Sequence, residues 1–425
     1  MNLSQQNPLI ACSKGANLIN SEKKLLSVGV VTFVIFSFIT LKFNPGFAGA
    51  HDDSYFYLKM FNYIKSQDSL IPLTHYQVAT SPIFVCLIGG LQIVFGSFFT
   101  MILHLLYLCF ALLSIYFFIQ ILDSNRFLLC LPFVILFSSS GYFVAPSIWP
   151  TSDAPAILFA ILTIYMLQRR RYFGFATASF LLVSTRQNFA WLLLAMFFYE
   201  CLAEMKFSIE SLQKLIKYIP ALFSLTVTFI YFGGHLSTPS YLSNQSQNSY
   251  PLPNFLNSIQ IGITLLSFLG ALAVFLNRES LVFNLGSRLF AILSGFAFFP
   301  MFFLLTNSKH PLVEGLGWIS LLSLKLHVSL IVIALLATIG LALSFFLAFQ
   351  KVVKVSMLPI SMLVSLLLFT LLMPIPFLRY FEFSLILITS MLTMNLDRSL
   401  LPTKSYKYVA VGIFFLVLNA SKIFN

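Results

Sequence analysis

Long apolar runs, separated by short polar segments, make up most of the chain. A helix that crosses the hydrocarbon core of a bilayer needs about 20 predominantly apolar residues. The runs that approach or reach this length are each predicted to form a helix, and they are 25–43, 82–95, 99–122, 127–145, 153–168, 174–199, 216–233, 258–276, 288–306, 326–349, 356–374, 377–394 and 407–421. The short run at 82–95 predicts a half-helix or an element that does not fully cross. The pattern predicts an all-α fold, a polytopic transmembrane helical bundle with about 12 or 13 spans.

The order of the runs indicates one transmembrane domain, 25–425, preceded by a cytoplasmic N-terminal tail, 1–24. Neither a Gly/Ser-rich or Pro-rich linker nor an internal repeat divides this domain. The tail lacks the compact charged, apolar and cleavage regions of a signal peptide, so the first run is predicted to be a retained helix. We expect an extracytoplasmic loop at 44–81 and a polar loop, rich in Ser, Asn, Pro and Tyr, at 233–257.

The composition agrees with lipid as the main solvent of this chain. Of 425 residues, 59% are hydrophobic and only 9% are charged, and the mean hydropathy is +0.91. A soluble domain carries about 25% charged residues, so this chain cannot cover a water-exposed surface of its size. The net charge is +12, but the cations lie mostly between apolar runs. That placement is typical of membrane orientation and contact with anionic lipid headgroups, so we expect no nucleic-acid partner.

Lysine and arginine in short loops predict the orientation of the bundle. Lys23-Lys24 before the first run and Arg169–Arg171 after 153–168 are both expected to face the cytoplasm. Four complete crossings between 82 and 168 would place these two groups on opposite sides. An incomplete crossing by 82–95 would remove the conflict.

Two adjacent acids follow the first run, although the whole chain contains only 13. Because neighbouring carboxylates repel, one of Asp52 and Asp53 could hold a raised pKa and act as a base, or the pair could bind a cation or a hydroxyl-rich ligand. The alternative is a solvated acid pair at the interface. His75, in the same loop, is a further candidate for substrate binding.

A polar cluster, Arg186-Gln187-Asn188, interrupts the apolar run 174–199. An arginine at the centre of a spanning helix costs roughly 2.5–3.5 kcal/mol on insertion scales, and such residues usually face a polar cavity. The guanidinium matches phosphate geometry, so this cluster is a candidate for binding a phosphorylated substrate. An arginine that snorkels to the interface is the alternative.

The remaining candidates for substrate binding lie near the ends of other runs. Lys309 and His310 could bind a phosphate or could signal topology. Arg379 with Tyr380 is another candidate, although Glu382, three residues after Arg379, could neutralise it on the same helix face.

Asp153 begins the run 153–168, where the helix dipole favours an acid. A simple helix cap is its default role, and substrate binding is the alternative. The five cysteines form no metal-ligand spacing, and no P-loop, dinucleotide fingerprint, HExxH or GxSxG motif occurs. We therefore predict neither a metal nor a cofactor.

Taken in order, these segments resemble the GT-C class of membrane glycosyltransferases, and within it the family of the terminal α-1,2-glucosyltransferase of the dolichol pathway. That family has an acid pair in the first loop and an arginine-rich set of later motifs. The matching segments here are Asp52-Asp53, Thr80-Ser81-Pro82, Pro150-Thr151-Ser152-Asp153, Arg186-Gln187-Asn188 with Trp191, Ser308-Lys309-His310 and Arg379-Tyr380.

The resemblance implies an inverting transfer of a hexose from a polyprenyl-phosphate carrier to a lipid-linked or surface glycan. Asp52, with Asp53 in reserve, would be the general base. The resemblance also implies a bacterial inner membrane location, or the endoplasmic reticulum membrane in a eukaryote. Two other interpretations stay open: a secondary transporter or lipid-linked-glycan flippase that uses Arg186 and Glu382, and a non-catalytic assembly subunit.

Overall fold

The computed structural model describes residues 8–45, 80–122, 126–204, 215–236 and 405–423, together with Ser54, Leu58 and single residues between 358 and 394. Within these residues nearly every position is helical and no strand occurs, which confirms the all-α part of the predicted fold class. The predicted runs between 258 and 349 and most of the loops at 44–81 and 233–257 lie outside the described residues.

The helices follow the predicted apolar runs closely. Two of them, α3 and α7, coincide with the predicted runs 82–95 and 153–168. The elements are α1 (Pro8–Phe43), α3 (Pro82–Phe95), η3 (Gly96–Phe98), α4 (Phe99–Ile121), α5 (Phe127–Ser139), α6 (Gly141–Ile148), α7 (Asp153–Gln168), α8 (Tyr172–Thr185), η5 (Gln187–Phe189), α9 (Ala190–Glu204), η6 (Ile216–Tyr218), α11 (Ile219–Tyr231) and α19 (Ser405–Ile423). Helix α1 begins inside the predicted tail, so residue 24 marks no break in the backbone.

Two predicted single runs are each broken into two helices. The run 174–199 is divided between α8 and α9, because Arg186 has the extended dihedrals φ −143° and ψ 107°. The run 127–145 is divided at Ser140, and α5 and α6 meet there at 47°. Polar residues stand at both breaks, but hydropathy alone does not show whether a polar residue inside an apolar run ends the helix.

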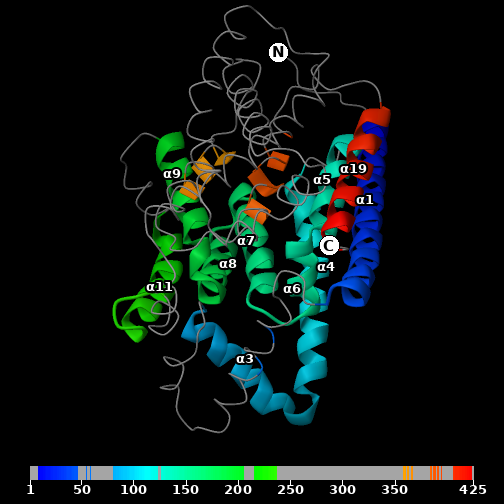
Figure 1. Cartoon of the computed structure of the whole chain (residues 1–425). Coiled ribbons are helices and arrows are strands. Elements are labelled where there is room, and N and C mark those ends of the chain that lie inside the picture. Colours follow the sequence, from blue (N-terminus) through cyan, green and yellow to red (C-terminus); the bar gives the residue numbers. More distant parts are fainter. Residues whose placement is uncertain are drawn as a thin grey trace, which may run out of the picture.

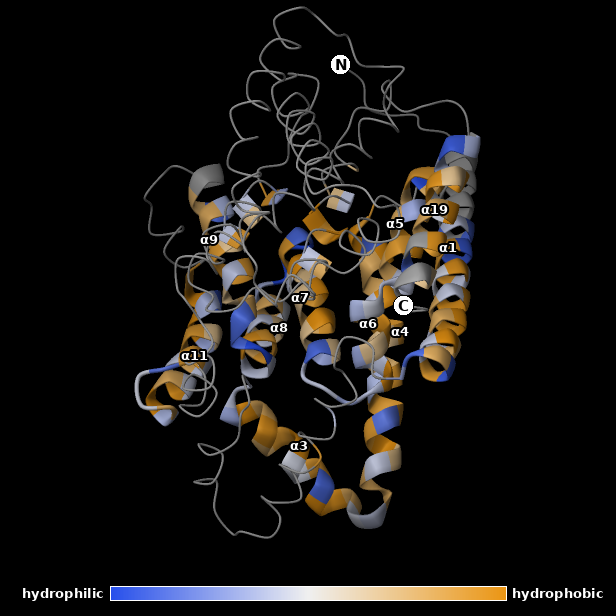
Figure 2. Cartoon of the chain, in the orientation of Figure 1, coloured by the Kyte–Doolittle hydropathy of each residue, from blue (hydrophilic) through white to orange (hydrophobic). Residues whose placement is uncertain are grey.

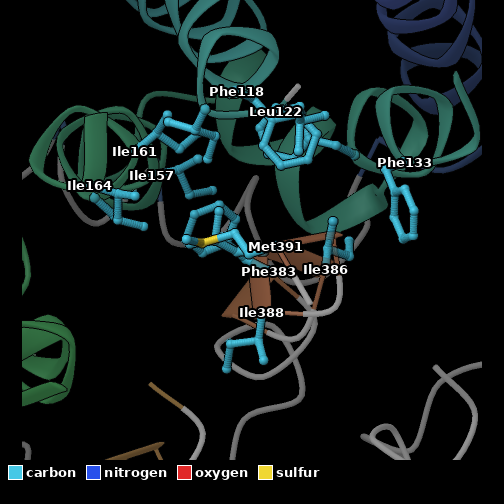
Figure 3. Close-up of a cluster of buried hydrophobic side chains, with 14 of the residues drawn as sticks. Phe118, Leu122, Phe133, Ile157, Ile161, Ile164, Phe383, Ile386, Ile388 and Met391 are labelled. Atoms are coloured by element: carbon cyan, nitrogen blue, oxygen red, sulfur yellow. The ribbon is translucent and has the colours of Figure 1, made fainter. Parts of the chain in front are cut away.

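Large apolar side chains fill the space between the helices. Helix α7 packs between α4 and α8, α11 packs on α8, and α1 and α19 pack on α5 (Figure 1). Phe118 of α4 and Phe137 of α5 stack with ring centroids 4.5 Å apart. Figure 3 shows side chains of α4, α5 and α7 meeting Phe383 and Met391, which are distant in sequence. The core therefore joins the N-terminal helices to residues near the C-terminus.

The helices define two ends of the bundle. Phe33, in the second half of α1, lies 5.6 Å from Phe143 of α6 between ring centroids, so α1 runs toward α6. The chain then enters α7 at Asp153, and α7 runs away from that end. Lys23-Lys24 and Arg169–Arg171 consequently lie at one end, here called the Arg169 end, and Asp153 lies at the other, the Asp153 end.

Helix α3 lies across the Asp153 end and does not run the length of the bundle (Figure 1). The chain turns at η3, where Gly96 has a positive φ of 51°, and α4 then runs back along the bundle. A positive φ favours glycine because it has no Cβ. This turn lets the two cationic groups share one end, as the orientation argument required.

Two of the described helical stretches, Asn20–Phe43 and Pro82–Ile121, are long and apolar enough to cross a membrane. The bent pair α5 and α6 is a third if it counts as one span. Figure 2 shows apolar residues along most of α1, α4 and α5, with polar residues gathered toward helix ends. These features are compatible with a location in a membrane.

Candidate functional site

A buried ion pair joins α7 to the end of α8. Arg186 Nη2 lies 2.7 Å from Asp153 Oδ1, and the two side chains are only 4% and 9% exposed. A charged group that is buried loses its hydration, so a buried arginine without a partner is strongly destabilising. A carboxylate in contact with the guanidinium compensates its charge. Arg186 therefore does not snorkel to an exposed position, and it lies within the bundle with a fixed partner.

Local backbone structure positions both charges. Asp153 occupies the first turn of α7, where the Thr151 hydroxyl accepts a hydrogen bond from the Asp153 amide at 3.3 Å. The Tyr107 hydroxyl donates to the Thr151 carbonyl, which ties this turn to α4. Arg186 ends α8 with its amide bonded to the Leu182 carbonyl at 2.9 Å. Asp153 thus lies where the helix dipole favours an acid, as predicted, and its carboxylate also holds Arg186.

Four hydroxyl groups lie around the start of α3, and we call them the hydroxyl cluster: Thr80, Ser81, Ser152 and Thr228. Thr80 donates to Ser152 at 3.3 Å, and Ser81 lies 2.8 Å from Thr228. Because Thr228 donates to the Ser224 carbonyl at 2.9 Å, Ser81 is the donor to Thr228. All four are buried. The cluster fastens α3 to the residue before Asp153 and to α11.

The structure brings three of the sequence segments together. Thr80-Ser81-Pro82 contacts Ser152, and the neighbouring Asp153 contacts Arg186. These positions are far apart in the chain, yet they meet at the Asp153 end. Gln187 beside Arg186 is buried, and Asn188 is half-buried. Whether these residues bind substrate remains a prediction.

The other predicted site residues lie outside the described residues. They are Asp52, Asp53, His75, Lys309, His310, Arg379 and Tyr380. The residues next to the acid pair are partly described: Ser54 is 2% exposed, and Leu58 packs on the apolar cluster that contains Tyr107 and Ala154. Leu58, five positions after Asp53, therefore packs beside the start of α7.

Sequence reasoning missed several polar residues of this region. Tyr107, Ser224 and Thr228 lie within apolar runs and were treated only as parts of predicted spans. Ser224 and Thr228 are one helical turn apart, so they share a face, and this spacing was the available signal. The contact between Ser184 and Ser224, at 2.7 Å, continues the same polar seam between α8 and α11.

A second, partly buried charge pair lies toward the Arg169 end. Lys217 pairs with Glu200, and the Tyr218 hydroxyl donates to Glu200 at 2.7 Å. The Lys217 ammonium also lies 4.9 Å and 4.8 Å from the ring centroids of Tyr172 and Phe175. Cation–π contacts of this kind stabilise an ammonium group away from water. The pair fastens α11 to α8 and α9.

An apolar groove of about 700 Å³ runs between α9 and α11. It begins at Ala190, four residues after Arg186, and extends to Leu215. Its walls include Leu193, Leu194, Phe197, Ile219, Leu222 and Leu225. The groove is of the size that holds a small-molecule ligand, and its lining suits a hydrocarbon chain.

Comparison with family models, with curated proteins and with solved structures finds no match to this chain. Among the described residues, no three His, Cys, Asp or Glu side chains gather as metal ligands do. The region offers a buried guanidinium held by a carboxylate, next to hydroxyl groups and an apolar groove. This combination suits a ligand with an anionic head and an apolar tail.

Proposed function

We propose that the chain is a multi-pass membrane glycosyltransferase that moves a hexose from a polyprenyl-phosphate carrier to a glycan acceptor. The observation that carries the proposal is the meeting of three motif segments at the Asp153–Arg186 pair. If these segments resembled the motifs only by chance, there would be no reason for them to meet at one end of the bundle.

The membrane part of the proposal rests on the apolar helices and on the distribution of charge. The two or three helices that are long enough to span would belong to a bundle of about 12 or 13 spans. Lys23-Lys24 and Arg169–Arg171 share one end, which would face the cytoplasm. The Asp153–Arg186 pair would then lie toward the extracytoplasmic side.

The proposed reaction is one displacement with inversion. The acceptor hydroxyl oxygen bonds to the anomeric carbon while the bond from that carbon to the phosphate oxygen breaks. The hydroxyl proton passes to Asp52, with Asp53 in reserve, and the electron pair leaves on the lipid phosphate. A phosphate is already a good leaving group, so this scheme invokes no metal. Fixed cations would stabilise the charge that develops on it.

Among the described cations, Arg186 is our candidate for that role. Asp153 holds its guanidinium at 2.7 Å and would fix its orientation before substrate arrives. The phosphate would share the guanidinium, which has five N–H donors, with Asp153. The lipid chain would extend from the phosphate into the groove that starts at Ala190.

The proposal is tested by hexose transfer from a synthetic polyprenyl-phosphate hexose to a lipid-linked glycan acceptor. The double variant Asp52→Asn/Asp53→Asn should lose about a hundredfold or more of this activity, because a general base contributes that much. Glu22→Gln, an acid substitution in α1 on the side of the Arg169 end, is the matched control and should keep full activity. Full transfer by the double variant, at equal protein level, would overturn the mechanism.

The buried ion pair also favours a second candidate, a transporter or flippase. Charged residues among apolar helices often mark a transport pathway. Movement of a lipid-linked sugar across sealed vesicles, without any new glycosidic bond, would identify this function. A new bond on the acceptor would identify the transferase.

A further inference from the structure

The turn between α7 and α8 forms a strongly cationic surface, here called the basic turn and comprising residues 169–173. Arg169, Arg170 and Arg171 are consecutive and all exposed. None of them forms an ion pair with an acid among the described residues. Glu200, the acid that lies near Tyr172 through Lys217, is already bonded to Lys217 and Tyr218. The basic turn therefore presents uncompensated positive charge on the surface of the described part of the chain.

Exposed aromatic side chains adjoin these cations. Phe173 is 87% exposed and Tyr172 is 46% exposed. Arg169 lies over the ring of Tyr165, 5.4 Å from its centroid, which holds the guanidinium close to the helix end. Arginine beside exposed aromatic rings is typical of the zone where lipid headgroups meet the hydrocarbon core.

The backbone of the basic turn favours glycine, not arginine, at its centre. The Arg171 amide bonds to the Met166 carbonyl at 2.9 Å, and the Arg170 amide bonds to the Leu167 carbonyl at 3.0 Å. These two bonds form the Schellman arrangement that ends many helices, usually with glycine at the residue of positive φ. Here that residue is Arg170, with φ 54°. A side chain at this angle costs free energy, so the chain keeps a cation where glycine would be more stable.

We propose that the basic turn binds the phosphate headgroup of an anionic phospholipid at the Arg169 end. The arginines would hold the phosphate oxygens, and Phe173 would enter the acyl region beside them. The proposal rests on the membrane location proposed above but not on the glycosyl transfer. Free phosphate could use the same arginines, but it could not use the exposed ring of Phe173, and for this reason we assign the site to a lipid.

The experiment is native mass spectrometry of the full chain in detergent, titrated with phosphatidylglycerol, with phosphatidylcholine and with inorganic phosphate. The chain should retain phosphatidylglycerol in preference to phosphatidylcholine. Arg170→Gly should weaken phosphatidylglycerol binding about fivefold, the equivalent of roughly 1 kcal/mol for each basic residue near an anionic surface. The same variant should raise the thermal stability of the lipid-free protein, because it relieves the positive φ. Loss of binding with gain of stability cannot come from misfolding.

Lys42→Gln is the matched control. Lys42 is an exposed cation at the Asp153 end, with its ammonium 5.5 Å from the ring centroid of Phe43. The substitution therefore removes the same charge beside an aromatic ring, but at the opposite end of the bundle. It should leave phosphatidylglycerol binding unchanged. The proposal is overturned by equal retention of the two lipids, by unchanged binding in Arg170→Gly, or by an equal loss in Lys42→Gln. Displacement of phosphatidylglycerol by inorganic phosphate would assign the site to free phosphate and would also overturn the lipid assignment.

Discussion

At the scale of single residues, the Asp153–Arg186 pair is the feature on which the candidate site depends. Both side chains are nearly inaccessible to water, so each charge relies on the other. Breaking a buried pair by removing one partner leaves an uncompensated charge, which is strongly destabilising, whereas replacing both charges together is often tolerated.

We therefore expect Asp153→Asn to destabilise the protein by about 3–5 kcal/mol, since Arg186 would stay charged without its carboxylate. The double variant Asp153→Asn/Arg186→Gln should recover a large part of that loss. Thermal unfolding in detergent, arranged as a double-mutant cycle, measures the coupling between the two residues. If the effects of the two single variants simply add, the contact contributes nothing to stability and the pair has no structural role.

At the scale of elements, α1 packs unusually closely on α4 and α5 at Gly29. A Cβ added there would meet Ile115 Cγ2 at 2.7 Å and Val134 Cγ1 at 3.1 Å. Small residues at helix crossings let backbones approach in this way. The first helix therefore depends on one glycine for its position against the bundle.

Gly29→Ala should lower stability by about 1–3 kcal/mol, because it overpacks a fully buried contact. Gly90→Ala provides the control: a Cβ at Gly90 would meet nothing within 4 Å, and alanine is the better helix former. Its melting temperature should be unchanged or higher. Equal melting temperatures for wild type and Gly29→Ala would contradict the close approach.

The apolar runs predict the helices well but predict their breaks poorly. The bounds of α3 and α7 follow directly from where the apolar pattern starts and stops. The breaks at Ser140 and Arg186 coincide with polar residues inside apolar stretches, but hydropathy cannot tell whether such a residue ends a helix, because that depends on its backbone angles. The site shows the same limit: Arg186 and Asp153 were each recognised as unusual, but their pairing depends on how α7 packs on α8.

At the scale of the whole molecule, charge separates the two ends of the bundle. The Arg169 end carries the lysine pair of α1 and the arginines of the basic turn, whereas the buried ion pair lies at the other end. Within a bilayer, this asymmetry would orient the chain with the Arg169 end in the cytoplasm.

Single cysteines test this orientation in a background where the five native cysteines are replaced by serine. Arg171→Cys, exposed in the basic turn, should react with a membrane-impermeant maleimide only from the cytoplasmic side of sealed vesicles. His235→Cys, exposed just after α11, should react only from the opposite side. Labelling of both positions from the same side would show that the two ends do not lie across a membrane.

The contacts of α11 with its neighbours differ along its length. Polar contacts fasten it at its start, through Lys217 and Tyr218 of the adjoining η6, and in its middle and second half, through Ser224 and Thr228. The wall that it shares with α9 is lined by apolar side chains. Glu200 of α9 holds Lys217 and Tyr218 just before α11. A parting of the two helices that kept these bonds would open only the apolar part of the wall, and a guest molecule would enter there sideways from the hydrocarbon phase, without first passing through water.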